Sequence, residues 1–223
     1  MAYRQTSTIE ARLHDNRNRI LEVARSLVSA GGWKEAHVAN IALAAGMATG
    51  TVYRYFSSKA ELFAEVLSAV SQREVDVLNQ IANSDGAPIE RLHAAVATFV
   101  RRAMRNPRLA YALIAEPCDR EIDEARLTYR AEISEVFRSL IIMGQASKEL
   151  RSDFQSEVAA SVIVGGFMEG LIGPLSPLSL QQYEETEQYQ LEVAKLADQI
   201  AGLACASVAC TPVNILQTKR SKK

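Results

Sequence analysis

The hydrophobic residues of this chain recur at every third or fourth position over most of its length, without a sustained alternation of apolar and polar residues. Such spacing places apolar side chains on one face of an α-helix, whereas a half-buried strand requires alternation. We therefore predict an all-α fold of nine helices. Their approximate ranges are 20–30, 37–45, 49–55, 58–83, 88–105, 107–114, 121–146, 154–171 and 183–209.

Turn-forming residues divide this helical pattern into two regions. The cluster Ser84-Asp85-Gly86-Ala87-Pro88 is the strongest break in the chain. We predict a small N-terminal domain over residues 1–58, a connecting fourth helix over 58–83, and a larger helical bundle over 84–213. The last stretch, 214–223, carries four basic residues and no acidic ones, which predicts a disordered basic tail.

The N-terminal domain contains two short helices separated by a glycine. Gly46 follows the apolar residues of the first short helix, where a left-handed residue ends a helix. Val52 and Phe56 are four residues apart, so they anchor the second short helix inward. Two short helices around a glycine turn form a helix-turn-helix, whose second helix enters the DNA major groove. Ser58 and Glu61 then predict a capping box at the start of the fourth helix.

The residues left outside this hydrophobic face have the chemistry of a DNA contact. Arg54 and Lys59 are cationic, the two tyrosines and two threonines carry hydroxyls, and Gly50 lets the helix lie deep in a groove. We predict that DNA binds to His37, Thr49, Gly50, Thr51, Tyr53, Arg54, Tyr55 and Lys59.

The distribution of charge supports this prediction, although the net charge of the chain is only -1. Residues 1–59 contain eight Lys and Arg against four Asp and Glu, while the region that follows is acidic. A basic end on an acidic body is expected of a protein that meets phosphate at one end. Arg4, Arg12 and Arg17 are candidates for an N-terminal arm on DNA.

The segment Gly50-Thr51-Val52-Tyr53-Arg54-Tyr55-Phe56-Ser57-Ser58-Lys59, with Ile41-Ala42 and Ala45-Gly46 before it, resembles the DNA-binding signature of the TetR family of bacterial transcriptional repressors. The resemblance covers about residues 17–70. It implies a homodimer that binds operator DNA and responds to a small molecule. Two positions depart from the family pattern: Ala48 replaces a capping Ser, and His37 replaces a Thr or Ser. We expect Thr49 to take over the capping role.

Other classes of protein find little support in the sequence. The three cysteines are too scattered for a disulfide framework or a zinc site, and Glu90-Arg91-Leu92-His93 has no second Glu-x-x-His motif with which to bind two iron ions. No nucleophile has a plausible His partner, so we predict no enzyme activity, no metal and no cofactor. The polar N-terminus and the charge at Glu169 in the most apolar stretch predict a cytoplasmic protein that does not cross a membrane.

Small residues are repeated on the last two long helices, which the family resemblance implies as the dimer contact. Glycine inside a helix costs about 1 kcal/mol relative to alanine, so repeated glycines indicate a close approach by another backbone. The alternative is tight packing within one subunit. The predicted dimer residues are Ala159, Ile163, Gly166, Gly170, Ala197, Ala201 and Ala204.

Aromatic residues and methionines on the helices of the bundle form either a plain core or the lining of an effector pocket. Under the second interpretation, a small and mostly apolar effector binds to Met104, Tyr111, Ile114, Phe137, Phe167 and Glu169. We therefore predict a ligand-responsive repressor released from a palindromic operator. Two alternatives stay open: a DNA-binding regulator without an effector, and a helical-bundle enzyme or carrier.

Overall fold

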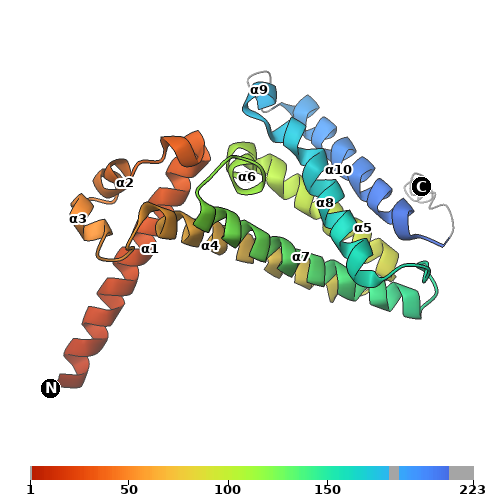
Figure 1. The fold of residues 1–223 in the computed structure, drawn as a ribbon, viewed down its shortest axis with the longest axis horizontal. Coiled ribbons are helices and arrows are strands. Elements are labelled where there is room, and N and C mark those ends of the chain that lie inside the picture. The colour runs from red at the N-terminus through yellow and green to blue at the C-terminus, as the bar shows by residue number, and fades with distance from the viewer. Residues whose placement is uncertain (1, 181–185, 211–223) are drawn as a thin grey trace. The chain divides into compact units, whose positions relative to one another are not determined.

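The computed structural model describes residues 2–180 and 186–210, which form ten helices and no strand (Figure 1). The fold class predicted from the sequence is therefore confirmed. The predicted basic tail over 214–223 lies outside the described residues. The helices are α1 (Ala2–Glu35), α2 (Val38–Ala44), α3 (Thr49–Val52), α4 (Lys59–Ala82), α5 (Pro88–Arg105), α6 (Pro107–Ile114), α7 (Arg120–Ala146), α8 (Ser156–Leu175), α9 (Pro177–Leu180) and α10 (Glu187–Val208).

Helix α3 ends at Val52 and not at residue 55 as predicted, and helices α1 and α8 differ more from the sequence prediction in their extent. Helix α1 begins at Ala2, far before the first residue of the predicted apolar stripe, and contains a non-helical residue, Gly32, near its end. Helix α8 continues through Gly173 and Pro174 to Leu175, whereas the sequence predicted an end before them. The short helix α9 follows and was not predicted.

The chain folds into two compact units. One unit, called the head here, contains the residues up to Ser71 together with Arg108–Leu127; the other, called the body, contains Gln72–Pro107 and the residues from Thr128 onward. The segment Arg108–Leu127 was assigned to the C-terminal domain on sequence, but its contacts group it with the N-terminal helices. Helix α4 and helix α7 each contribute residues to both units.

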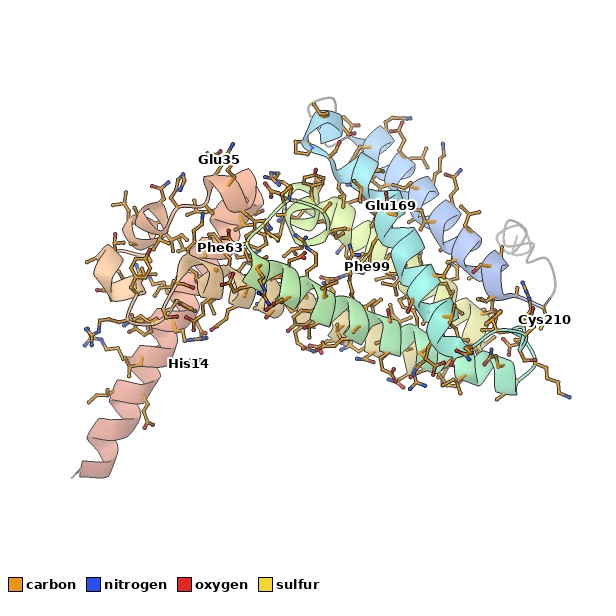
Figure 2. The ribbon with its side chains drawn as sticks, viewed as in Figure 1. His14, Glu35, Phe63, Phe99, Glu169 and Cys210 are labelled. Atoms are coloured by element: carbon orange, nitrogen blue, oxygen red, sulfur yellow. The ribbon has the colours of Figure 1, made fainter. Side chains whose placement is uncertain are left out.

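The core of the head is built from one face of each of its helices. Ile20, Ala24 and Val28 of α1 are fully buried, which confirms the apolar stripe seen in the sequence. Phe63 of α4, labelled in Figure 2, packs its ring against Trp33 with the centroids 5.3 Å apart. This core holds α2 and α3, the two helices of the helix-turn-helix, in place.

The core of the body is formed largely where α5 lies against α8 and α10. The rings of Phe99 and Phe137 both pack against Phe167 of α8, at centroid distances of 4.9 and 5.6 Å (Phe99 is labelled in Figure 2). The hydroxyl of Tyr189 on α10 donates to the Met104 carbonyl of α5 at 3.1 Å. By length and composition α8 could cross a membrane, but a core helix meets the same criterion, and one side of α8 is buried.

Candidate nucleic-acid interface

The turn between α2 and α3 has the geometry of a glycine-terminated helix. Gly46 has φ +66°, its N–H donates to the Leu43 carbonyl at 3.0 Å, and the Met47 N–H donates to the Ala42 carbonyl at 2.9 Å. These two bonds are the pair that defines a Schellman motif, which requires a left-handed residue at the glycine position. The role predicted for Gly46 is confirmed.

Helix α3 is held by two buried anchors. Val52 and Phe56 are each only 1% exposed, as their four-residue spacing predicted. Helical hydrogen bonds continue past the end of α3, because the N–H groups of Tyr55 and Phe56 both donate to the Val52 carbonyl, at 3.0 and 3.1 Å. Residues 49–56 are therefore anchored to the head through Val52 and Phe56, and the side chains between these two anchors lie at the surface.

The predicted DNA-binding residues all belong to the head, and none has its side chain in the core. Five are exposed: His37, Thr49, Gly50, Tyr53 and Arg54. Three are partly exposed: Thr51, Tyr55 and Lys59. The Lys59 ammonium lies 5.3 Å from the centroid of the Phe63 ring, which holds it near the start of α4. The structure therefore presents one basic, hydroxyl-bearing surface around α3, called the α3 surface here.

The helix caps around this surface differ from the sequence prediction. Ala48 is the N-cap of α3, and Thr49, as the first helical residue, makes no capping bond, so the capping role expected for Thr49 is wrong. At α4 the Glu61 N–H donates to the Ser58 hydroxyl at 3.0 Å, as predicted. The Glu61 carboxylate, however, accepts from the hydroxyl and N–H of Ser57, both at 2.5 Å, one residue earlier than a standard capping box. The hydroxyl bond from Ser57 lowers the pKa of the Glu61 carboxyl.

The residues proposed for an N-terminal arm have different environments. Arg17 forms an ion pair with Glu65 of α4, and its guanidinium lies 4.9 Å from the centroid of the Phe56 ring. Arg17 therefore ties α1 to the end of the recognition turn, and its assignment to an arm is wrong. Arg12 is exposed on α1, whereas the side chain of Arg4 lies outside the described side chains.

Two residues of α1 that the sequence did not single out also reach the helix-turn-helix. The Asn16 amide nitrogen donates to the Tyr55 hydroxyl at 3.1 Å. The exposed Arg19 side chain passes the turn, because a Cβ built on Gly46 would lie 3.2 Å from its Nη2 atom. The three-residue spacing of Asn16 and Arg19 puts both on one face of α1, but only the folded head shows that this face borders the recognition turn.

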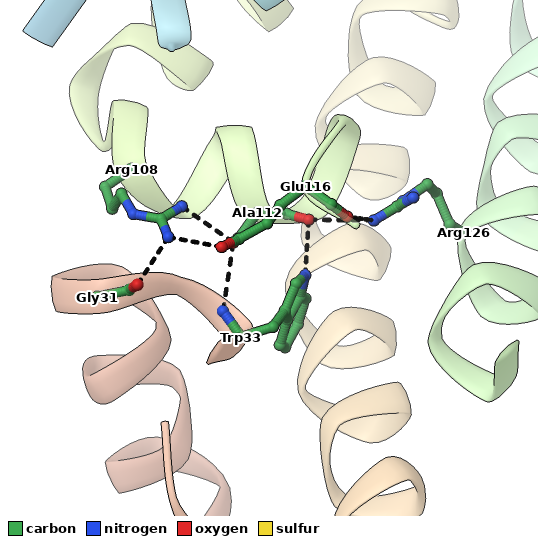
Figure 3. Close-up of polar contacts among 6 residues, drawn as sticks. All are labelled: Gly31, Trp33, Arg108, Ala112, Glu116 and Arg126. Carbon is green, nitrogen blue, oxygen red and sulfur yellow. Dashed lines mark hydrogen bonds and ion pairs between the residues drawn. The ribbon is translucent and has the colours of Figure 1, made fainter. Parts of the chain in front are cut away.

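A cluster of polar contacts joins the end of α1 to α6 within the head (Figure 3). The Trp33 indole N–H donates to the Ala112 carbonyl at 2.7 Å, and its backbone N–H donates to Glu116 at 3.2 Å. Arg108 donates to the same Glu116 carboxylate at 2.8 Å and to the Gly31 carbonyl at 2.7 Å. We call this cluster the Trp33 clasp.

Gly32 lies inside the clasp and has little freedom to change. Its φ of +81° is in the left-handed region, and an added Cβ would lie 1.6 Å from Nη2 of Arg108. A side chain at this position would therefore displace the guanidinium and strain the backbone. The contacts of the clasp therefore require glycine at position 32.

The residues predicted for an effector site do not form one group. Phe137 and Phe167 belong to the aromatic core of the body, and Met104 is also buried there. Tyr111 and Ile114 belong to the head. Glu169 is exposed on α8, because the buried face of this helix is occupied by its neighbours Phe167 and Met168; its assignment to an apolar pocket is wrong.

The predicted dimer residues divide between the core and the surface. Ala159, Ile163, Ala197 and Ala201 are buried within the subunit, so for these four the intrasubunit alternative is correct. Ala204 is half-buried. Gly166 and Gly170 are exposed.

In the described part of the chain, no group of three or more His, Cys, Asp or Glu is arranged to hold a metal ion.

Residues 20–66 match the family of bacterial regulatory proteins, tetR family. The repressor KstR of Mycolicibacterium smegmatis is 33% identical over 99 residues, which cover 44% of this chain and 48% of KstR. The chain thus spans about half the length of this curated relative.

Solved structures extend the similarity to the body, at the level of the fold. FadR of Bacillus halodurans, a fatty acid degradation regulator, has a TM-score of 0.72 at 19% identity, covering 85% of this chain and 94% of FadR. FadR of Bacillus subtilis, solved with stearoyl-CoA, has a TM-score of 0.71 at 17% identity, covering 84% of this chain and 97% of that one. Both share the helical fold of the present chain.

Proposed function

We propose that this chain, a member of the TetR family of bacterial transcriptional regulators, is a cytoplasmic repressor that binds a palindromic operator as a homodimer and leaves it when a small apolar effector binds. The observation that carries the proposal is the α3 surface: a rigid recognition turn whose inward residues are buried and whose outward residues are cations, hydroxyls and a glycine.

The α3 surface suits the major groove because its residues divide into two kinds of contact. Lys59 neutralises a phosphate, and Tyr53 and Tyr55 donate their hydroxyls to the backbone. Thr49 and Arg54 face base edges, where an arginine that makes two bonds to a guanine discriminates by about 1–3 kcal/mol. A Cβ at Gly50 would meet no atom within 4 Å, so the protein itself does not require glycine there, and the bare backbone serves a close approach to DNA.

Arg19 adds a cation on the other side of the recognition turn. Its guanidinium lies beside Gly46, before α3, whereas Lys59 lies after it. Phosphate contacts on both sides of a recognition helix fix its position without reading sequence. We therefore include Arg19 among the residues that hold the operator backbone.

The dimer forms through the exposed faces of α8 and α10. The exposed residues of α8 recur at three- and four-residue spacing: Glu157, Val158, Ser161, Val162, Gly165, Gly166, Glu169, Gly170 and Gly173. A Cβ built on Gly165, Gly166 or Gly173 would meet no atom within 4 Å. Glycines that cost about 1 kcal/mol each in a helix are thus not required by this subunit's own packing, which supports a second copy as the partner.

The neighbouring helix extends this surface. Leu203 of α10 is 74% exposed and Val162 of α8 is 62% exposed, so each of the two helices carries a large apolar side chain in solvent. Two such helices from each copy make a four-helix bundle related by a two-fold axis. The two-fold axis in turn explains a palindromic operator, whose half-sites lie about 34 Å apart.

The effector acts on the packing of the body. Phe99, Phe137 and Phe167 form an aromatic cluster in the body. A long apolar effector would bind between these rings and separate them. The fold shared with a FadR solved with stearoyl-CoA supports an acyl chain as the first effector to test. Helix α4 contributes residues to both units. Its Glu74 forms an ion pair with Arg102 of α5 at 2.6 Å, so a change in the packing of α5 would act on α4.

Two measurements test this function. Operator fragments are first selected from random-sequence duplexes with the purified full-length protein, and binding is then followed by fluorescence anisotropy as a function of salt. Lys59→Ala should weaken binding to all sequences alike and reduce the salt slope by about 1, while Arg54→Ala should relax discrimination at one base pair. Unchanged operator affinity in both variants, with folding intact by circular dichroism, contradicts the proposed interface.

Long-chain acyl-CoA, a free fatty acid and CoA alone are then compared for thermal stabilisation and for release of the same duplex. An effector that binds the DNA-incompetent state more tightly should do both, with a coupling of about 1–3 kcal/mol. If stabilising compounds leave DNA affinity unchanged, the regulator without an effector becomes the better description.

A further inference from the structure

Among the described side chains, one hydrogen bond joins α1 to the recognition turn. The Asn16 amide nitrogen donates to the Tyr55 hydroxyl at 3.1 Å across 39 positions of sequence. Both residues are half-buried, so the bond lies at the edge of the head rather than in its core. Tyr53, two residues away on the same turn, is 48% exposed, and no described residue hydrogen-bonds to its hydroxyl. The two tyrosines of the α3 surface therefore differ in how firmly they are held.

The direction of this bond determines what the tyrosine can still do. A phenolic hydroxyl has one proton to donate and lone pairs to accept with. Because Asn16 donates, it uses a lone pair of the Tyr55 oxygen and leaves the O–H proton free. Donation to a hydroxyl oxygen also polarises its O–H bond, which strengthens the bond the hydroxyl makes next. Tyr55 is thus prepared to donate to an anionic acceptor.

The backbone around Asn16 is fixed from two directions. The next residue, Arg17, pairs with Glu65 and stacks on Phe56, which itself follows Tyr55 in the chain. One turn further along α1, Ile20 is fully buried. These contacts hold the backbone at Asn16 and Tyr55 in place, and the hydrogen bond between the two side chains then orients the phenol in the free protein.

We propose that Asn16 is a positioning residue for operator binding: it holds the Tyr55 hydroxyl so that its proton points toward a phosphate oxygen of the DNA backbone. This inference rests on the operator binding proposed above. Its physical basis is preorganisation, because a side chain already ordered in the free protein loses less conformational entropy on binding. Asn16 itself need not touch DNA.

A double-mutant cycle tests the proposal with the selected duplex, using wild type, Asn16→Ala, Tyr55→Phe and the double variant. Asn16→Ala should weaken binding by roughly 2- to 10-fold, the range of one hydrogen bond, when Tyr55 is present, and should have no effect in the Tyr55→Phe background. Asn16→Asp should weaken binding more than Asn16→Ala, because the carboxylate accepts the Tyr55 proton and repels phosphate.

Asn18→Ala is the matched control. Asn18 is exposed on the same helix, and its amide nitrogen lies 3.1 Å from Nδ1 of His14 instead of reaching the recognition turn. This variant should bind the duplex as wild type does. Thermal unfolding of every variant, measured without DNA, identifies any that are only less stable.

The possible failures can be told apart. If Asn16→Ala weakens binding equally in the Tyr55 and Tyr55→Phe backgrounds, Asn16 only supports the fold. If Asn16→Ala leaves binding unchanged or makes it tighter, Asn16 does not orient the proton of the Tyr55 hydroxyl. Either result overturns the proposal. If Tyr55→Phe binds like wild type, operator binding stands but the phosphate contact of Tyr55, and this inference with it, is wrong. If wild type selects no duplex at all, the proposed function itself fails.

Discussion

Replacing Gly166 by leucine tests the proposed dimer face, because a side chain at position 166 would point into open space among the described residues of its own subunit. An added Cβ there meets no atom within 4 Å, whereas one added at Gly170 would contact Ile200 at 3.5 Å. Gly166 is also exposed on a helix of regular geometry, so a leucine side chain has room in an isolated subunit. Any steric cost must therefore come from another molecule.

The two possible states of the protein give opposite signs for the effect on stability. In an isolated subunit, leucine replaces glycine in a helix interior and should stabilise the fold by up to about 1 kcal/mol. In a dimer packed backbone to backbone, overpacking costs about 1–3 kcal/mol at each copy of the residue. Because a two-fold interface contains the residue twice, the expected loss is about 2–6 kcal/mol of association free energy. Such a loss raises the dissociation constant by at least about 30-fold.

Sedimentation velocity over a range of protein concentrations measures the association, and thermal unfolding measures the fold. We expect Gly166→Leu to shift the protein toward monomers, to keep its helical content, and to lose operator affinity because paired half-sites are lost. Ala131→Leu, on an exposed position of α7, adds a comparable apolar side chain away from this face and should stay dimeric. A Gly166→Leu protein that remains a dimer with undiminished affinity would refute the reasoning.

Three further predictions follow from the head and from the cysteines. Arg19→Ala should weaken operator binding without changing its sequence preference and should reduce the salt slope by about 1, as measured by anisotropy; a loss of discrimination would instead indicate a base contact. Gly32→Ala should destabilise the fold by about 2 kcal/mol or more in denaturant unfolding, because it strains a left-handed residue and displaces Arg108, and a neutral result would show that the guanidinium moves aside freely. Burial raises the pKa of the Cys205 thiol to about 12, so at pH 8 it stays protonated and should resist a thiol reagent until the protein unfolds, whereas the exposed Cys210 should react at once.

The sequence by itself determined the helix-turn-helix, because its signals act over a few residues. The left-handed turn at Gly46 and the four-residue spacing of Val52 and Phe56 depend on backbone geometry that neighbours in the chain dictate. The same holds for the Ser58 bond to Glu61. The all-helical class also follows from periodicity alone.

Only the tertiary structure decided which way α8 faces. Its residues are small or apolar nearly all round, so periodicity does not fix its rotation about its axis. The predicted stripe of small residues runs along the border between the two faces: Ala159 and Ile163 turn toward the core, and Gly166 and Gly170 toward solvent. Packing against α5 and α10 sets this border, and it also leaves Glu169 outside the core.

Long-range contacts likewise escaped the sequence because nothing local encodes them. Asn16 meets Tyr55 across 39 residues, and Trp33 meets Glu116 across 83. Each pair joins helices whose own patterns predict only that they are helices; the pairing depends on how the apolar faces of those helices come together in one core. The sequence thus determined which local elements form, and the burial of their apolar faces decided which polar residues meet at the proposed interface.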